Sequence, residues 1–158
     1  MEIDRETEIF FDASCLIAGA YSLRGGSSFL LRLCKHNYLK GVVSHPVLIE
    51  AERNIRDKFS PEVVLTYRNL LESVDFINIR VPSPEEGVFG GGIVEKKDEH
   101  VLAAVLEAAV PYLITLDQNL KVDINAVDLP VTAFTPGDFI KKVLPRHIDY
   151  PEMRNDVD

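Results

Sequence analysis

Two aspartates each come directly after a short apolar segment that is long enough to form a strand. Asp12 follows residues 8–11 (EIFF), and Asp117 follows residues 112–116 (YLITL). If both segments are parallel strands of one sheet, the two carboxylates lie on the same rim, where such sheets bind ligands. An aspartate in this place can equally cap the following helix by accepting hydrogen bonds from its first free N–H groups. Sequence position alone leaves both roles open.

A third aspartate, Asp98, stands near the start of a predicted helix over residues 97–109. It precedes three apolar residues by four, seven and eleven positions, which places it on the inward face of that helix. A carboxylate there gains from the unpaired N–H groups and the helix dipole. A charge on an inward face nevertheless needs a partner or a metal ion. The alternative is a capping acid paired with Lys96 or Lys97.

Two glutamates, Glu50 and Glu52, compete for a further position on a predicted helix over residues 46–59. The apolar stripe of this helix consists of Val47, Leu48, Ala51, Ile55 and Phe59. At about 100° per residue the two acids lie on opposite flanks of that stripe, so periodicity does not choose between them. We expect one of the two to lie on the solvated face, in a salt bridge with Arg53 or Arg56.

Strands and helices are predicted to alternate along most of the chain. The predicted strands cover residues 8–11, 41–44, 74–81, 112–116 and 129–134. The predicted helices cover residues 13–22, 27–36, 46–59, 61–73, 97–109 and 136–144, and residues 82–92 are predicted as a glycine-containing connector. This alternation is typical of a three-layer α/β/α protein with a mainly parallel central sheet. We predict one domain over residues 1–144 and a polar, partly disordered tail over residues 145–158.

Four short motifs, in this order along the chain, resemble those of the PIN-domain family. Residues 10–14 (FFDAS) are similar to its opening motif of two apolar residues, Asp, any residue, and Ser or Asn. Residues 44–50 (SHPVLIE) resemble the second motif, in which Glu follows Ser or Thr by six positions. Residues 97–104 (KDEHVLAA) and 113–117 (LITLD) are close to the third and fourth motifs. By this match Glu50 is the second carboxylate of the family pattern.

The resemblance implies a PIN-like fold and an endoribonuclease that hydrolyses RNA with Mg²⁺ or Mn²⁺. It implies Asp12 and Asp98 as central metal ligands, and Asp117 and Glu50 as outer or second-site ligands. Oxygen donors suit these cations, which keep several waters, so a few carboxylates suffice. A bound ion can supply the attacking hydroxide, neutralise charge at phosphorus and stabilise the leaving oxygen.

The same match suggests supporting residues and partners. Ser14 and Thr115 are expected to hydrogen-bond and orient the carboxylates. Candidates for contact with the phosphate backbone, each close to a motif, are Arg24, Arg53, Lys96, Lys97 and Lys121. The family implies a toxin of a toxin–antitoxin pair of the VapC kind, with an antitoxin protein and a homodimer as partners.

Net charge, the length of the apolar stretches and the cysteine spacing argue against several classes of protein. The 158 residues carry a formal net charge of −8, which argues against a protein whose whole surface grips phosphates. No apolar stretch is long enough to span a bilayer, and residues 1–8 are too charged for a signal peptide, so a cytoplasmic protein with no membrane partner is expected. Cys15 and Cys34 lack metal-type spacing and are expected to be reduced core thiols.

Two other functions fit parts of the sequence. A haloacid-dehalogenase-like phosphatase would use Asp12 as its nucleophile, but that class has a second Asp two residues later, where this chain has Ser14. A PIN fold that serves only as a binding module would be expected to lose the four acids, which are all present here.

Overall fold

The computed structural model describes residues 1–86 and 92–157. Its centre is a five-stranded sheet in which every neighbouring pair of strands is parallel, in the order β3-β2-β1-β4-β5. The strands are β1 (Glu8–Phe11), β2 (Lys40–Ser44), β3 (Ile77–Ile79), β4 (Tyr112–Ile114) and β5 (Thr132–Phe134). The predicted α/β class with a parallel central sheet is therefore confirmed.

Strand β1 lies at the centre of the sheet because its side chains are apolar on both faces. Ile9, Phe10 and Phe11 are fully buried, as expected for a strand covered on both sides. Phe10 lies opposite Val42 of β2 and Leu113 of β4. The strands away from the centre are shorter than predicted: β3 spans three residues of the predicted 74–81, and β5 three of 129–134.

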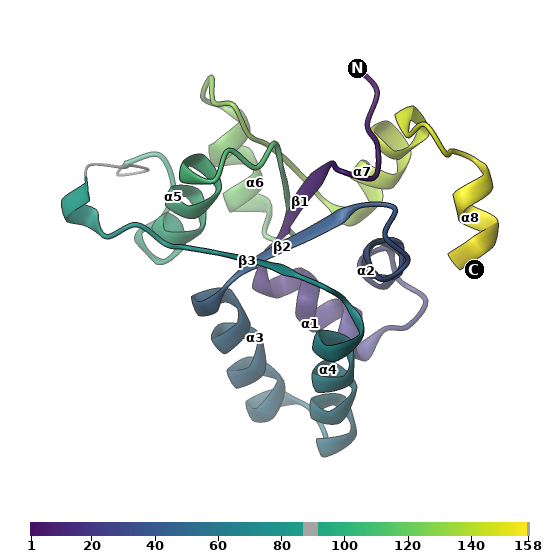
Figure 1. Cartoon of the computed structure of the whole chain (residues 1–158). Coiled ribbons are helices and arrows are strands. Elements are labelled where there is room, and N and C mark those ends of the chain that lie inside the picture. The colour runs from purple at the N-terminus through teal and green to yellow at the C-terminus, as the bar shows by residue number, and fades with distance from the viewer. Residues whose placement is uncertain (87–91, 158) are drawn as a thin grey trace.

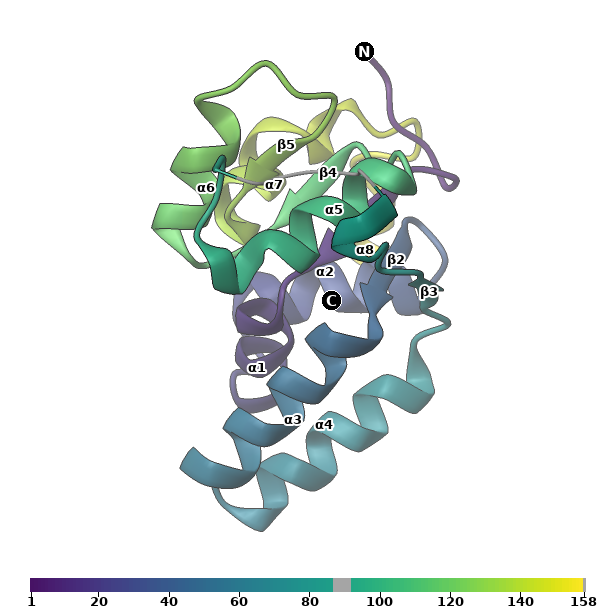
Figure 2. The ribbon, with the colours of Figure 1, turned by 90° about the vertical axis from the view of Figure 1, so that its left-hand side faces the viewer.

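Helices cover both faces of the sheet. They are α1 (Ala13–Tyr21), α2 (Gly26–Lys35), α3 (His45–Lys58), α4 (Pro61–Ser73), α5 (Glu99–Glu107), α6 (Gln118–Asn125), α7 (Pro136–Lys142) and α8 (Glu152–Val157), with single 3-10 turns at η1 (Pro84–Glu86), η2 (Lys96–Asp98) and η3 (Leu144–Arg146). Figure 1 shows α1, α3 and α4 on one side of the sheet and α5 and α6 on the other. Figure 2 shows α3 and α4 as a pair that extends away from the sheet.

Helix α6 is absent from the sequence prediction, which left the segment after Asp117 without an element. In the structure the Asp117 carboxylate accepts a hydrogen bond from Leu120 N (3.2 Å) and so caps this helix. Leu120 and Ile124, four residues apart, are its buried residues. The sequence does contain a capping residue followed by two apolar residues at helical spacing. Two buried apolar residues are too few to predict a helix from periodicity.

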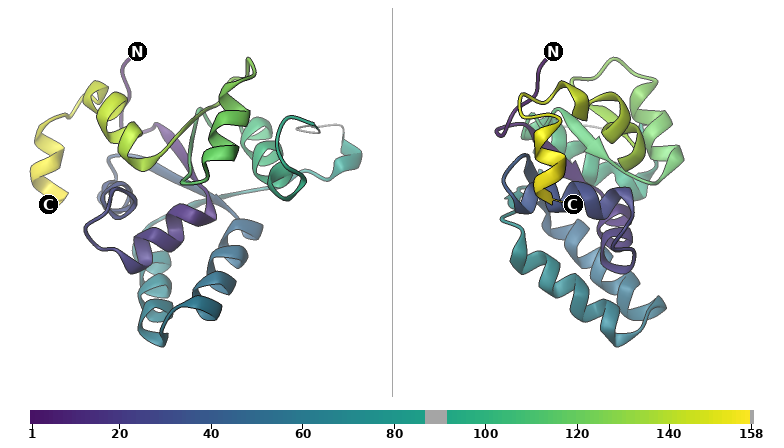
Figure 3. Two further views of the ribbon diagram at one scale, coloured as in Figure 1. Left: turned by 180° about the vertical axis from the view of Figure 1, so that it is seen from behind. Right: turned by 90° about the vertical axis from the view of Figure 1, so that its right-hand side faces the viewer.

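Residues 145–157 differ from the prediction of a partly disordered tail, because they form η3 and α8 and pack on the domain. Met153 is fully buried and Val157 nearly so. Arg32 of α2 donates a hydrogen bond to the Val157 carbonyl oxygen (3.1 Å), and α8 lies beside α2 (Figure 3). The segment returns to the start of the chain, where Ile3 forms a parallel bridge with His147. The tail is thus part of the folded unit.

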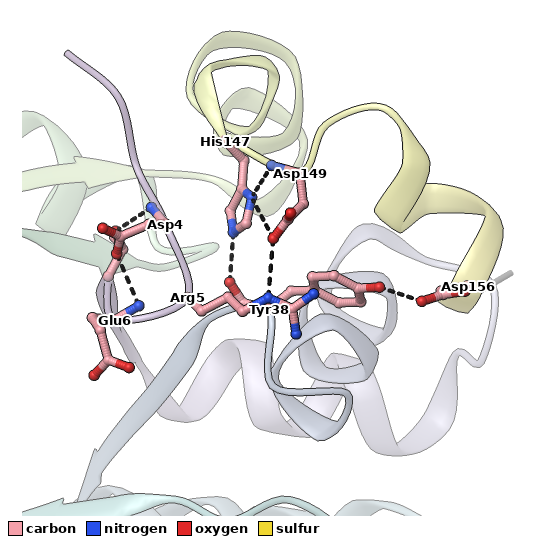
Figure 4. Close-up of polar contacts among 8 residues, drawn as sticks. Asp4, Arg5, Glu6, Tyr38, His147, Asp149 and Asp156 are labelled. Atoms are coloured by element: carbon pink, nitrogen blue, oxygen red, sulfur yellow. Dashed lines mark hydrogen bonds and ion pairs between the residues drawn. The ribbon is translucent and has the colours of Figure 1, made fainter.

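A cluster of polar side chains, here called the C-terminal clasp, fixes this return (Figure 4). It consists of Arg5, Tyr38, His147, Asp149 and Asp156. Buried His147 donates from Nε2 to the Tyr38 carbonyl oxygen (2.7 Å) and accepts at Nδ1 from Asp149 N (3.0 Å). Arg5 pairs with the Asp149 carboxylate (3.0 Å) and stacks over the Tyr38 ring (4.3 Å), while the Tyr38 hydroxyl bonds the Asp156 carboxylate.

Other expectations have mixed outcomes. Cys15 and Cys34 are free and buried, as predicted. In the described part of the chain, no helix combines the length and the apolar character that a bilayer span requires.

Of the predicted connector 82–92, residues 87–91 lie outside the described residues. The predicted helix 97–109 is divided into η2 and α5, so Asp98 stands at the boundary between them.

Candidate functional site

Asp12 leaves the carboxyl end of the central strand and is almost completely buried, with 7% of its surface exposed. It occupies the N-cap of α1, where Ala13 N donates to its Oδ1 (2.9 Å). The capping role proposed from sequence is therefore real. A cap needs only one such bond, but the Asp12 carboxylate also accepts hydrogen bonds from two side-chain hydroxyls.

Two hydroxyl groups hold the second oxygen of Asp12. Thr115 Oγ1 donates to Asp12 Oδ2 (2.7 Å) and Ser14 Oγ donates to the same atom (3.3 Å). Each hydroxyl also accepts a backbone N–H from the segment that leaves β4: Leu116 N to Ser14 Oγ (3.0 Å) and Asp117 N to Thr115 Oγ1 (3.0 Å). The two predicted supporting residues thus connect the ends of β1 and β4 around the Asp12 carboxylate.

Asp117 has both of the roles considered for it. Its Oδ1 caps α6 through Leu120 N, and its Oδ2 lies 3.8 Å from Lys97 Nζ. Burial is the main cause that raises the pKa of Asp12 and of Asp98, and the negative charge of Asp117 adds to both shifts, so the three aspartates lie close enough to interact. The prediction that strand-end acids share one rim is consistent with this arrangement.

Asp98 is a half-buried carboxylate with no hydrogen bond or ion pair within residues 1–86 and 92–157. It stands at the N-cap of α5, yet its side chain makes no capping bond. Burial first, and then the charge of Asp12, raise its pKa to about 6, while Lys97 opposes the shift. The alternative in which Asp98 caps the helix and pairs with Lys96 or Lys97 does not describe this geometry.

The electrostatic state of the cluster is an excess of negative charge. Burial is the main cause that raises the pKa of Asp12, even though its three hydrogen bonds act in the opposite direction. Lys97 is the cation in contact, and its pKa is raised by the charges of Asp98, Glu95, Asp117 and Glu50 in that order. Since the Lys97 side chain is 67% exposed and 3.8 Å from Asp117, water screens much of its effect.

The two glutamates of α3 have different surroundings. Glu52 pairs with Arg56 (3.7 Å) and with Arg68 of α4 (3.3 Å), which confirms that one of the two acids is held in a surface salt bridge. Glu50 is exposed and its charge acts on Lys97. The structure therefore directs Glu52 toward Arg68 of α4, whereas the Glu50 carboxylate forms no ion pair with another described residue.

The predicted basic contacts are only partly brought to the site. Lys97 touches the cluster, as described above. Lys121 pairs instead with Asp138 (3.5 Å). Arg24, Arg53 and Lys96 are exposed, and none of them forms an ion pair with another residue of the described chain. The structure therefore leaves their side chains in solvent and, among the described residues, gives them no ion pair with the carboxylates.

The carboxylates do not form a ready-made metal cage. Within the described residues, no group of three or more His, Cys, Asp or Glu side chains is arranged to hold an ion. The donor set nevertheless suits Mg²⁺ or Mn²⁺, because these ions prefer carboxylate oxygens and retain waters. Asp98 and Glu50 make no side-chain hydrogen bonds to other described residues, so both can move toward an ion without breaking an existing contact.

Two residues near the cluster were not among the predicted site residues, although Ser44 opens the second motif. Glu95 lies 3.8 Å from Lys97 Nζ and helps raise the pKa of Asp98. Ser44, at the end of β2, is fully buried, and its hydroxyl has no partner in the described structure. The sequence feature that could have identified Ser44 is its position at the end of the strand that neighbours β1.

Comparisons with known proteins add no constraint. The sequence matches no model of a protein family and no curated protein. The functional assignment therefore depends on the residues and geometry described above.

Proposed function

We propose that the protein is a metal-dependent endoribonuclease whose active site is the cluster of Asp12, Asp98, Asp117 and Glu50. The observation that carries the proposal is the group of three aspartates at the carboxyl end of the sheet, whose one ion pair within the described residues joins Asp117 to the exposed Lys97 (3.8 Å). A folded protein gains no stability from such crowding, so a bound cation is its simplest explanation.

The residues of the chain have distinct roles in this proposal. Asp12, fixed by Thr115 and Ser14, is the rigid ligand, because its carboxylate is already oriented by hydrogen bonds. Asp98 is the second central ligand, and its free side chain adjusts to the ion. Asp117 and Glu50 are outer or second-site ligands. A bound Mg²⁺ or Mn²⁺ ion would supply a hydroxide at neutral pH and neutralise charge at the scissile phosphate.

The substrate class and partners come from the resemblance to PIN domains. RNA is the proposed substrate, and Lys97, with the exposed Arg53 and Lys96, is the proposed contact to its phosphates. A toxin–antitoxin role makes an antitoxin protein and a second copy of this chain the partners to test. A small DNA-binding protein encoded by the neighbouring gene would support the first, and light scattering would measure the second.

The decisive experiment is cleavage of mixed RNAs by the purified protein in Mg²⁺ or Mn²⁺, with and without a chelator. Glu50→Gln should reduce turnover by orders of magnitude, whereas its matched control Glu52→Gln, whose carboxylate faces Arg56 and Arg68, should change it little. Cleavage that persists both with chelator and in Asp12→Asn would refute the proposal. Vanadate-sensitive turnover of a phosphomonoester would favour the phosphatase alternative instead.

A further inference from the structure

The hydroxyl of Ser44 is buried and has no hydrogen-bond partner among the described residues. The residue is 0% exposed. A buried hydroxyl left without a partner destabilises the fold, and buried polar groups in native proteins almost always have a partner. The site therefore favours an additional group that this hydroxyl can bind.

The sheet register puts Ser44 in the same row as Asp12. Strand β1 pairs with β2 from Glu8 opposite Lys40 to Phe10 opposite Val42, and continuing this register brings Asp12 opposite Ser44. The register with β4 brings Asp12 opposite Thr115, and Asp12 N still donates to the Ile114 oxygen (3.0 Å). Because residues in one row of a parallel sheet project to the same face, Ser44, Asp12 and Thr115 form a hydroxyl–carboxylate–hydroxyl row.

The two hydroxyls of this row differ in their contacts. The Thr115 hydroxyl donates a hydrogen bond to Asp12 and accepts one from Asp117 N. The Ser44 hydroxyl neither donates nor accepts a hydrogen bond within the described residues. The row is thus complete toward β4 and open toward β2, the strand that leads directly into the helix carrying Glu50.

Helix capping does not account for Ser44. It occupies the N-cap of α3, but its side chain makes no capping bond. A capping hydroxyl accepts from the N–H of the second or third helical residue, and the second residue of α3 is Pro46, which has no N–H. The usual reason for a serine at this position is therefore weakened.

We propose that Ser44 is a positioning residue of the carboxylate site, whose hydroxyl would bind a water in the hydration shell of a divalent cation held by these carboxylates. This inference rests on the proposed function. Mg²⁺ and Mn²⁺ retain waters when carboxylates bind them, and a serine hydroxyl can both donate to such a shell and accept from it. Ser44 supplies toward β2 what Thr115 supplies toward β4.

The test is a Mn²⁺ titration of the full chain, followed by the electron paramagnetic resonance signal of free Mn²⁺. Loss of an outer-shell partner lowers metal affinity by roughly 10- to 100-fold, so Ser44→Ala should weaken Mn²⁺ binding by about tenfold or more. Ser44→Thr, which keeps the hydroxyl, should bind Mn²⁺ close to wild type. The matched control is Ser60→Ala, because Ser60 is also an N-cap before a proline without a side-chain cap bond, but is exposed.

The remaining arms separate the possible failures. Thermal melts without ion check that each variant folds, and a helix-capping role would appear as a lower melting temperature of Ser44→Ala with unchanged Mn²⁺ affinity, which would overturn the inference. Asp98→Asn tests the site itself. If Asp98→Asn loses Mn²⁺ binding while Ser44→Ala retains it, only the role of Ser44 fails. If the wild type binds no Mn²⁺ at millimolar concentration, the proposed function fails together with it.

Discussion

The two ends of the sheet handle polar side chains in opposite ways. At the amino end of the strands, the C-terminal clasp gives each polar group a partner: both nitrogens of His147 are bonded, and Arg5 contacts both Asp149 and Tyr38. At the carboxyl end, the Asp98 carboxylate has no hydrogen bond to another described residue and Ser44 Oγ is unpartnered. Within the described residues, the one ion pair of the three aspartates is that of Asp117 with the exposed Lys97.

This contrast separates polar groups that serve folding from those available for binding. Satisfied buried groups stabilise a unique arrangement, whereas crowded or unpartnered groups reduce stability. A protein that gathers crowded or unpartnered polar groups in one place, while satisfying its other polar groups elsewhere, loses stability at the place where it needs reactivity. The predictions below test the two ends against each other.

The largest expected effect is on catalysis at the carboxyl end. Asp12→Asn should lower RNA cleavage by about 1000-fold or more, on the order of 4 kcal/mol in the barrier, because a charged ligand becomes neutral. Asn retains an oxygen for Ala13 N, so the fold should persist. Single-turnover cleavage of labelled RNA in Mn²⁺ measures the effect. Asp57→Asn, an equal change of charge at the far end of α3, should be silent, and equal losses in both variants would contradict the assignment.

The next largest effect is on folding at the amino end. His147→Ala should lower stability by about 3 kcal/mol, because it removes both hydrogen bonds of a buried side chain and leaves their partners unsatisfied. For a chain of this length the melting temperature should fall by roughly 6–12 °C. Circular dichroism melts provide the measurement, with His36→Ala as the exposed control. A melting temperature unchanged by His147→Ala would mean that the clasp does not hold the domain together.

A smaller effect of opposite sign is expected for Asp98→Asn in the absence of divalent ions. The folded state raises the pKa of Asp98 to about 6, above its unfolded value of about 3.8, so ionisation favours the unfolded chain. The penalty is absent below pH 4, develops between pH 4 and 6, and is complete above pH 6. Allowing for solvent screening of this partly exposed group, Asp98→Asn should stabilise the protein by about 1 kcal/mol at pH 7.5.

Urea unfolding with chelator at pH 7.5 and at pH 4 measures this difference, which should vanish at the lower pH. Adding Mn²⁺ at pH 7.5 should raise the melting temperature of the wild type more than that of Asp98→Asn, because the ion binds only the folded cluster. Stabilisation by the variant at both pH values would show that charge is not its cause.

The smallest effect concerns Glu52, the surface acid that is not part of the carboxylate cluster. Glu52→Gln breaks two exposed ion pairs, with Arg56 and Arg68, and should cost about 0.5 kcal/mol. Glu50→Gln, its matched partner two residues earlier, should cost nothing in stability. Urea unfolding of both variants at low salt resolves the pair, and a larger loss for Glu50→Gln would indicate that this residue has a structural partner.

Local pattern was sufficient where the determining contacts are local. The apolar runs at β1 and β4 predicted both strands and the acids that follow them, and α4 has the predicted bounds. The ordered C-terminus was not predictable in this way, since Met153 becomes buried only by packing of α8 against a helix over 100 residues earlier in the chain. A polar segment with few apolar residues gives no local sign of such a partner.

The candidate site shows the same division. The positions of Asp12, Asp98 and Asp117 follow from strand ends and helix periodicity. The ion pair between Lys97 and Asp117 does not, because it depends on how η2 is placed against the turn after β4. The free hydroxyl of Ser44 is likewise a property of the assembled sheet, although its position at the end of β2 was visible in the sequence.

The strand order also has a consequence during synthesis. The contact between Thr115 and Asp12 joins residues 103 positions apart, and at 5–20 residues per second a ribosome needs roughly 5–20 s to make that interval. For that time β1 can pair with β2 but has its other edge open, presenting the sequence Ile9, Phe10 and Phe11. An unpaired apolar edge is a template for wrong pairing. We therefore expect nascent chains stalled before residue 112 to engage chaperones, and chains that extend past β5 to be released from them.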